Sequence, residues 1–189
     1  MASKKAKPVL YRRKRERKTD YKKRLNLLES GLPRVVLRSS NSKLTAQIVK
    51  FDVRGDHILI GVDSNSLKKQ GWNFSKKSFP AFYLTGLSLA KAAKSKGVEG
   101  DLIFDAGLKS PSKKGKVYSF LKGALDGGLD IRHGGESMLP SEEKVSGKDI
   151  QDYANLLKES NADEYNKKFA TVLKNGADPT DIISVFEKV

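Results

Sequence analysis

The sequence contains no cysteine, and only two histidines, two methionines and one tryptophan among 189 residues. Without cysteine the chain has no disulfide, thiolate zinc site or thiol nucleophile, a composition that fits a reducing compartment. Two histidines leave little material for a metal centre. The longest apolar-leaning stretch, at 80–90, is much shorter than the roughly 20 residues that span a membrane. The basic N-terminus lacks the apolar segment of a secretory signal, so we expect a cytoplasmic protein without membrane association.

Positive charge is what the chain has in excess. Lys and Arg number 37 against 22 Asp and Glu, a formal net charge of +15, which favours nucleic acid as the partner. Residues 1–24 carry 12 basic and two acidic side chains, residues 25–140 carry 18 and 10, and residues 141–189 carry seven and 10. We therefore expect a basic RNA-binding arm at 1–24 that orders on a polyanion, a main domain at 25–140, and a different kind of unit at 141–189.

Three segments rich in β-branched residues predict strands at 34–38, 43–51 and 57–62. Short, turn-like connections between them predict a three-stranded antiparallel meander. A fourth strand is expected at 101–107. Because a helical crossover separates it from the third strand, we expect it to run parallel to that strand.

Helices fill the rest of the main domain. Ser78 and Pro80 begin one that is apolar on most of its circumference, and Val117 to Leu125 mark a second, amphipathic one. The predicted fold class is therefore α/β: the meander and the fourth parallel strand packed with helices, between the basic N-terminal arm and a helical C-terminal extension.

Two further helical regions are predicted outside this core. In the arm, Thr19 or Asp20 caps a short helix with Tyr21 on its apolar face, and we expect Tyr21 to pack in the core. Residues 141–189 predict three short helices, the first capped by Ser146 and the third opened by Pro179. About 45 residues is close to the lower limit for independent folding, so this extension should pack on the main domain or on a partner.

The arm carries the most specific functional signal. Residues 11–24, YRRKRERKTDYKKR, interleave nine cations with two tyrosines. Cations neutralise phosphates, and an aromatic ring can stack on an unpaired base. A solubilising tail or a localisation address is the alternative interpretation.

Two loops and one connection add weaker signals. The hairpin tip at 38–43 places hydroxyl and amide groups between cations, which suits sugar and phosphate contacts or an ordinary turn. The loop at 108–116 brings lysines to the start of a helix, either as a phosphate site or as a solvated loop. Phe79 is expected to pack in the core, whereas the role of Trp72 stays open between RNA contact and packing.

This strand and helix order is also that of ribonuclease H-like nucleases, with Asp105 at the end of the fourth strand, so the sequence also permits a catalytic interpretation. Two-metal hydrolysis needs several converging carboxylates, but Arg34 and Arg38 stand where the first acid is required. His57 and His133 form no recognisable catalytic pattern. We interpret Asp105 as a structural turn residue and the protein as noncatalytic, with a metal-dependent nuclease and a non-specific polyanion binder as alternatives.

Three longer segments of the sequence are similar to a known protein family. The segments YRRKRERKTDYKKRLNLLESGLPRVVLRSSNSKLTAQIV, FYLTGLSLAKAA and DAGLKSPSKKGKVYSFLKGALDGGLDIRHG resemble the archaeal and eukaryotic form of the family of ribosomal large-subunit protein eighteen. The resemblance implies an α/β core bound to 5S rRNA in the central protuberance of the large ribosomal subunit. It implies further contacts to large-subunit (23S-type) rRNA and to neighbouring large-subunit proteins, and neither enzyme activity nor a cofactor.

The resemblance also implies which residues contact RNA. They lie on the arm, the hairpin tip and the loop before the last predicted helix of the main domain: Tyr11, Arg12, Arg13, Lys14, Arg15, Arg17, Lys18, Lys22, Arg24, Arg38, Ser40, Asn41, Lys43, Lys113, Lys114 and Lys116. Lys116 stands where the family often has arginine, so the charge is kept but the bidentate fork is lost.

Overall fold

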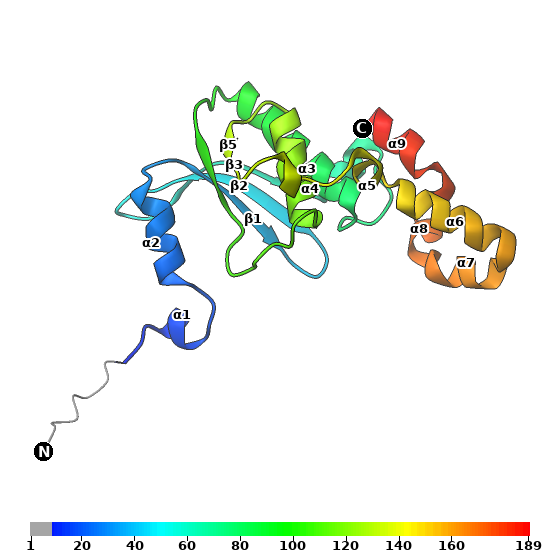
Figure 1. The fold of residues 1–189 in the computed structure, drawn as a ribbon, viewed down its shortest axis with the longest axis horizontal. Helices are drawn as coiled ribbons and strands as arrows, with labels where there is room; N and C mark the ends of the chain where they lie inside the picture. Colours follow the sequence, from blue (N-terminus) through cyan, green and yellow to red (C-terminus); the bar gives the residue numbers. More distant parts are fainter. Residues whose placement is uncertain (1–8) are drawn as a thin grey trace, which may run out of the picture.

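The computed structural model describes residues 9–189, so the first eight residues of the arm lie outside it. A five-stranded mixed sheet in the order β3-β2-β1-β4-β5 lies at the centre of the main domain (Figure 1). Its strands are β1 Arg34–Ser39, β2 Leu44–Lys50, β3 His57–Asp63, β4 Leu102–Asp105 and β5 Ile131–Arg132.

The predicted meander is confirmed. β1 pairs antiparallel with β2, and β2 pairs antiparallel with β3. The register places Val35 opposite Ile48, and both side chains are completely buried in the core. In β2, the buried Leu44, Ala46 and Ile48 alternate with partly exposed residues, since successive side chains of a strand point to opposite faces.

The fourth predicted strand is β4, and the structure shows which strand it pairs with. It pairs parallel with β1, with Val36 opposite Asp105, and not with β3. A meander has two open edges, at β1 and at β3, and the sequence pattern does not specify which edge a crossover reaches. Since β1 and β3 run in the same direction, β4 is also parallel to β3, and the predicted strand direction is confirmed. β5, which pairs parallel with β4, was not predicted because two residues show no periodicity.

Helices α3 (Phe79–Ser95) and α4 (Lys116–Asp126) pack on the sheet and against each other. The Ser78 hydroxyl caps α3 by accepting a hydrogen bond from the Ala81 amide. At the crossing of the two helices a Cβ on Gly86 would overlap the Phe120 carbonyl, and one on Gly123 would overlap the Tyr83 carbonyl. Glycine on both helices thus permits backbone contact that a larger residue would prevent.

The described part of the arm forms α1 (Arg12–Arg15) and α2 (Tyr21–Glu29), which project from the edge of the main domain (Figure 1). Asp20 caps α2, as predicted, by accepting a hydrogen bond from the Lys23 amide. The prediction that Tyr21 packs in the core is wrong: Tyr21 is 38% exposed and no residue of α2 is buried. Its ring contacts Tyr11 instead, with centroids 5.8 Å apart.

The extension is divided more finely than predicted. It comprises α5 (Glu142–Ser146), α6 (Lys148–Ser160), α7 (Ala162–Lys168), α8 (Ala170–Lys174) and α9 (Ile182–Lys188). Ser146 does not cap a helix but ends α5, where its hydroxyl donates to the Glu143 carbonyl. The left-handed backbone of Gly147 separates α5 from α6, and Phe169 interrupts the second predicted helix between α7 and α8.

Short 3-10 helices fill the remaining connections, at η1 (Ser66–Gln70), η2 (Glu136–Met138) and η3 (Pro179–Asp181). Within residues 9–189 no helix combines the length and apolarity that crossing a membrane requires.

The extension packs on the main domain through a second apolar cluster. Ile182 of α9 is buried there with Leu67, Trp72 and Leu84. Trp72 is only 2% exposed, and its indole N–H donates to the Ser75 carbonyl. Of the two roles left open by the sequence, RNA contact and packing, the structure therefore shows packing. Phe79 is only partly buried, with the Lys116 and Lys144 ammonium groups over its ring, so the prediction of a core position holds only in part.

Candidate nucleic-acid interface

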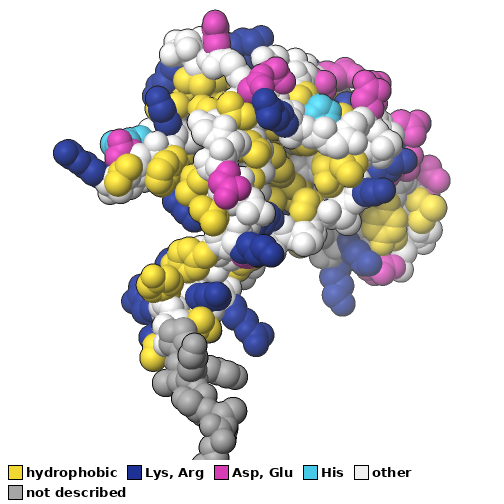
Figure 2. Space-filling view, turned by 60° about the vertical axis from the view of Figure 1, so that its left-hand side comes forward, with side chains coloured by type: hydrophobic (Ala, Val, Ile, Leu, Met, Phe, Trp, Pro, Cys, Tyr) yellow, Lys and Arg dark blue, Asp and Glu magenta, His cyan; other side chains and the backbone are white. Residues whose placement is uncertain are grey.

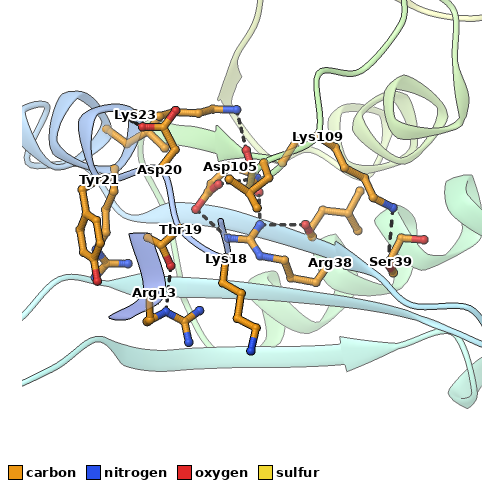
Figure 3. A pocket seen from close by; sticks show the side chains of 16 residues that line it. Arg13, Lys18, Thr19, Asp20, Tyr21, Lys23, Arg38, Ser39, Asp105 and Lys109 are labelled. Carbon is orange, nitrogen blue, oxygen red and sulfur yellow. Dashed lines mark hydrogen bonds and ion pairs between the residues drawn. The ribbon is translucent and has the colours of Figure 1, made fainter. Parts of the chain in front are cut away.

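A groove of about 550 Å³ lies between the arm and the sheet (Figure 3). One wall is α2 with the turn that precedes it, and the other comprises the end of β1 and the segment that follows β4. Parallel pairing brings the C-terminal ends of β1 and β4 to the same edge of the sheet. Six cationic residues line this groove: Arg13, Lys18, Lys23, Arg24, Arg38 and Lys109.

Asp105, one of two acidic residues in the lining, is already neutralised. Its Oδ2 lies 3.4 Å from Arg34 Nη1 and 3.1 Å from Arg38 Nη2, and its Oδ1 accepts a 2.7 Å hydrogen bond from the Gly107 amide. Burial alone would raise the pKa of Asp105, but these partners hold it below its ordinary value. The interpretation of Asp105 as a structural turn residue is confirmed.

Arg38 is held at the mouth of the groove by the same strand end. Its Nη1 donates to the carbonyls of Leu37 and Asp105, both at 2.9 Å. Half of its side chain remains exposed. The guanidinium is therefore oriented by the protein while part of its surface faces solvent.

Polar contacts fix α2 against this edge. Lys23 Nζ donates to the Gly107 carbonyl at 2.7 Å, and Arg24 Nη2 lies 2.8 Å from Asp56 Oδ2. The same oxygen lies 2.7 Å from Nη2 of buried Arg34. Although burial raises the pKa of Asp56, the hydrogen bonds from the two arginines lower it below the ordinary value.

The arm turns sharply before it reaches α2. Arg17 adopts a left-handed backbone with φ 52°, and Arg13 Nε donates to the Thr19 hydroxyl at 2.8 Å. Figure 2 shows dark blue cationic and yellow apolar side chains side by side on this projecting segment. Tyr11, which lies on this segment, is 76% exposed.

The predicted RNA contacts divide into four groups in space. Arg13, Lys18, Arg24 and Arg38 line the groove. The other six arm residues are exposed on or beside α1 and α2 without lining it: Tyr11, Arg12, Lys14, Arg15, Arg17 and Lys22.

Some of the predicted contacts at the hairpin tip stabilise the turn. The Ser40 hydroxyl accepts hydrogen bonds from the Ser42 and Lys43 amides, as in an ordinary turn. Lys43 Nζ lies 3.1 Å from Asp63, and Asn41 is exposed.

Lys113, Lys114 and Lys116 lie outside the groove, at the start of α4. Gly115 is the N-cap residue of α4, which therefore has no side-chain cap among the described residues. Lys114 has a left-handed backbone with φ 55°, and its amide donates to the Met138 carbonyl. Lys116 Nζ lies 5.8 Å from the centroid of the Phe79 ring.

Sequence reasoning omitted two cations of the groove. Lys23 belongs to the basic run of the arm, and Lys109 is the first cation of the loop after β4. Both therefore lie in segments that the sequence predicts to contact RNA. Lys109 Nζ lies 3.5 Å from the Ser39 carbonyl. What the sequence did not reveal is that α2 and this loop face each other.

The described residues do not support a metal-dependent nuclease. No three His, Asp or Glu side chains within 9–189 are grouped so that they could hold a metal ion. Asp105, the carboxylate at the expected strand end, is committed to Arg34 and Arg38. Two-metal hydrolysis needs carboxylates that converge on one point.

The basic arm from residue 5 and the meander fall within the match to a known family. The family model of the ribosomal large-subunit proteins 60S L5 and 50S L18 matches residues 5–102, just over half of the chain. The chain belongs to this family. It is therefore a structural, non-enzymatic component of the large ribosomal subunit that binds 5S rRNA. The match includes both helices of the arm, the three strands of the meander and all of α3.

Proposed function

We propose that the groove and the arm together form the surface that binds 5S rRNA. In this proposal the arm at 1–24 is the RNA-binding segment, the main domain at 25–140 provides the rigid wall, and residues 141–189 form the extension. The contacts are the sixteen residues named from the sequence, with Lys23 and Lys109 added. Through them the protein attaches 5S rRNA to the large subunit, helps form the central protuberance, and contacts large-subunit (23S-type) rRNA and neighbouring proteins.

The observation that carries this proposal is the charge of the groove. Six cations line it, whereas of its two acidic residues Asp105 is paired with arginines and Asp20 caps α2. A concave surface with one sign of charge concentrates the field and attracts a polyanion. Phosphate neutralisation with release of counterions then supplies most of the affinity.

Selectivity requires a second kind of contact. Tyr11 and Tyr21 present neighbouring, exposed rings at the outer end of α2. RNA with unpaired bases offers partners for such rings, whereas duplex DNA keeps its bases stacked inside. Shape and unpaired bases are thus the features by which the surface would prefer 5S rRNA over other polyanions.

The proposal is tested by the salt dependence of 5S rRNA binding by the full chain. If about eight phosphates are engaged, log affinity should fall with log salt at a slope of roughly −6 to −7. Replacing the groove residues Lys18 and Lys109 by glutamine should weaken binding and flatten the slope by about 1 to 2. The control pair is Lys91→Gln with Lys188→Gln, which removes the same charge from exposed positions outside the groove.

Equal losses in the two double variants would show that net charge alone matters, contrary to the proposal. Competition of 5S rRNA against duplex DNA and anionic vesicles provides the second check. A preference for 5S rRNA is expected, and equal competition would favour the non-specific polyanion binder instead.

A further inference from the structure

The outer face of α6 differs in character from the rest of the molecule. Asp149, Asp152, Leu156 and Glu159 follow the spacing i, i+3, i+7, i+10, which places them on one side of a helix. All four are exposed, and Leu156 is 60% exposed. Tyr153 flanks them at 43% exposure. An apolar side chain thus stands among three carboxylates on the surface of the extension.

This face is opposite the side by which α6 packs. Ala154 and Leu157 are buried against Tyr165, and Ile150 packs into the cluster around Trp72. Nothing in the remaining structure between residues 9 and 189 covers Leu156 or forms an ion pair with Asp149, Asp152 or Glu159. The nearby cations have other contacts, since Lys148 pairs with Glu143 and Lys168 lies over the Tyr153 ring.

The charge of this face indicates the class of its partner. Residues 141–189 carry 10 acidic and seven basic side chains, whereas the rest of the chain has 30 basic and 12 acidic ones. An RNA backbone is repelled by three neighbouring carboxylates, whereas lysine and arginine side chains are attracted to them. Complementary charge around an apolar contact is typical of a specific protein interface.

We propose that the outer face of α6 docks a Lys- and Arg-rich segment of another large-subunit protein, with an apolar side chain of that segment on Leu156. The proposal rests on the family's place in the large subunit. In Figure 1 α6 lies at the opposite end of the molecule from α1 and α2. The protein would thus bind RNA at one end and a basic polypeptide at the other.

Site-specific photo-cross-linking in assembled large subunits tests this assignment. Leu156 is replaced by p-benzoyl-phenylalanine, with the same replacement of the exposed Asn166 on α7 as the control. We expect the probe at position 156 to link to a peptide rich in Lys and Arg in another large-subunit protein, as identified by mass spectrometry. A link to rRNA, or no link above the control, overturns the proposal. The probe at Tyr153 repeats the measurement from the second apolar position.

A charge-reversal pair tests the electrostatic part. With the probe at position 156, adding Asp152→Lys and Glu159→Lys should lower the cross-link yield at least about tenfold, because attraction becomes repulsion. Glu99→Lys with Glu187→Lys makes the same charge change at exposed positions outside this face and should leave the yield unchanged. Equal yields in the two double variants would contradict the proposal.

Binding of free 5S rRNA separates this proposal from the function proposed above. The α6 variants should bind 5S rRNA as the unchanged chain does, and their thermal unfolding should be unaltered because these side chains are exposed. Failure of the cross-link with intact 5S binding would refute only the α6 interface.

Discussion

Asp105 and Arg34 show how single charged residues shape the site. Arg34 is only 2% exposed, yet it contacts two carboxylates, Asp105 on β4 and Asp56 before β3. A buried cation is tolerated only when it is paired and hydrogen-bonded. Because Asp105 also anchors Arg38, this small network connects the interior of the sheet to the mouth of the groove.

Asp105→Asn should destabilise the protein by about 3 kcal/mol at neutral pH, since it leaves buried Arg34 with one carboxylate partner. The pKa of Asp105 in the folded state lies below its ordinary value of 3.8. Its stabilising contribution is therefore present above that value and is lost as the pH falls through the folded pKa. Urea unfolding at several pH values should show the gap between the two proteins closing in acid.

Asp101→Asn is the matched control, because Asp101 pairs with Arg132 on the exposed surface. Its substitution should change stability little at any pH, as exposed ion pairs contribute little. If the two variants behaved alike, the structural role given to Asp105 would be wrong.

Among the elements, the crossing of α3 and α4 depends most on residue size. Gly86 and Gly123 lie where each helix contacts the other's backbone. Helix propensity alone would favour alanine over glycine by about 1 kcal/mol. The tertiary contact overrides that preference, because a methyl group would have to occupy the place of a carbonyl oxygen.

Gly123→Ala should therefore destabilise the fold by about 1 to 3 kcal/mol through overpacking, despite its better helix propensity. Denaturant unfolding measures the change. Gly61→Ala on β3 is the control, because a Cβ there would meet only Gln47 atoms at ordinary contact distances of 3.7 and 3.8 Å. A Gly123→Ala variant as stable as the control would show that the two helices separate at no cost.

The elements also show what could be predicted from the sequence and what could not. The wealth of β-branched residues revealed β1 to β3, and the caps at Asp20 and Ser78 fixed two helix starts. The sequence pattern did not specify which sheet edge β4 joins. With β4 beside β1, Asp105 lies opposite Val36, which places it between Arg34 and Arg38. The ion pairs at the groove depend on β4 lying beside β1. Hydrophobic periodicity does not specify which strands are neighbours in a sheet.

At the scale of the whole molecule, charge is divided between the two ends. The arm and groove gather cations, whereas the extension is mildly acidic and is fastened to the main domain through Ile182 and the cluster around Trp72. The family resemblance identified the ligand, and the basic composition alone had already indicated a polyanion. The position of α2, exposed and held by polar contacts, could not be foreseen, since its apolar spacing predicted a buried face.

Deleting residues 1–24 should flatten the salt dependence of 5S rRNA binding and weaken the affinity severely. The deletion removes 12 cations and most of one wall of the groove, while the sheet and its core remain. Filter binding at several salt concentrations measures both effects, and circular dichroism checks that the truncated chain is folded. Unchanged binding by a folded truncation would refute the role assigned to the arm.

Asp56 accepts hydrogen bonds from the guanidinium groups of Arg24 and Arg34 at once, so it can lose Arg24 and still be paired. A phosphate that enters the groove competes with Asp56 for Arg24, which lines the groove and is partly exposed. If Arg24 turns to the phosphate, Arg34 still lies 2.7 Å from Asp56, so the Asp56 carboxylate keeps one ion-pair partner. Ligand binding and the anchoring of α2 would then be reciprocally linked: RNA that engages Arg24 removes one contact that holds α2, whereas the hydrogen bond from Lys23 to the Gly107 carbonyl remains.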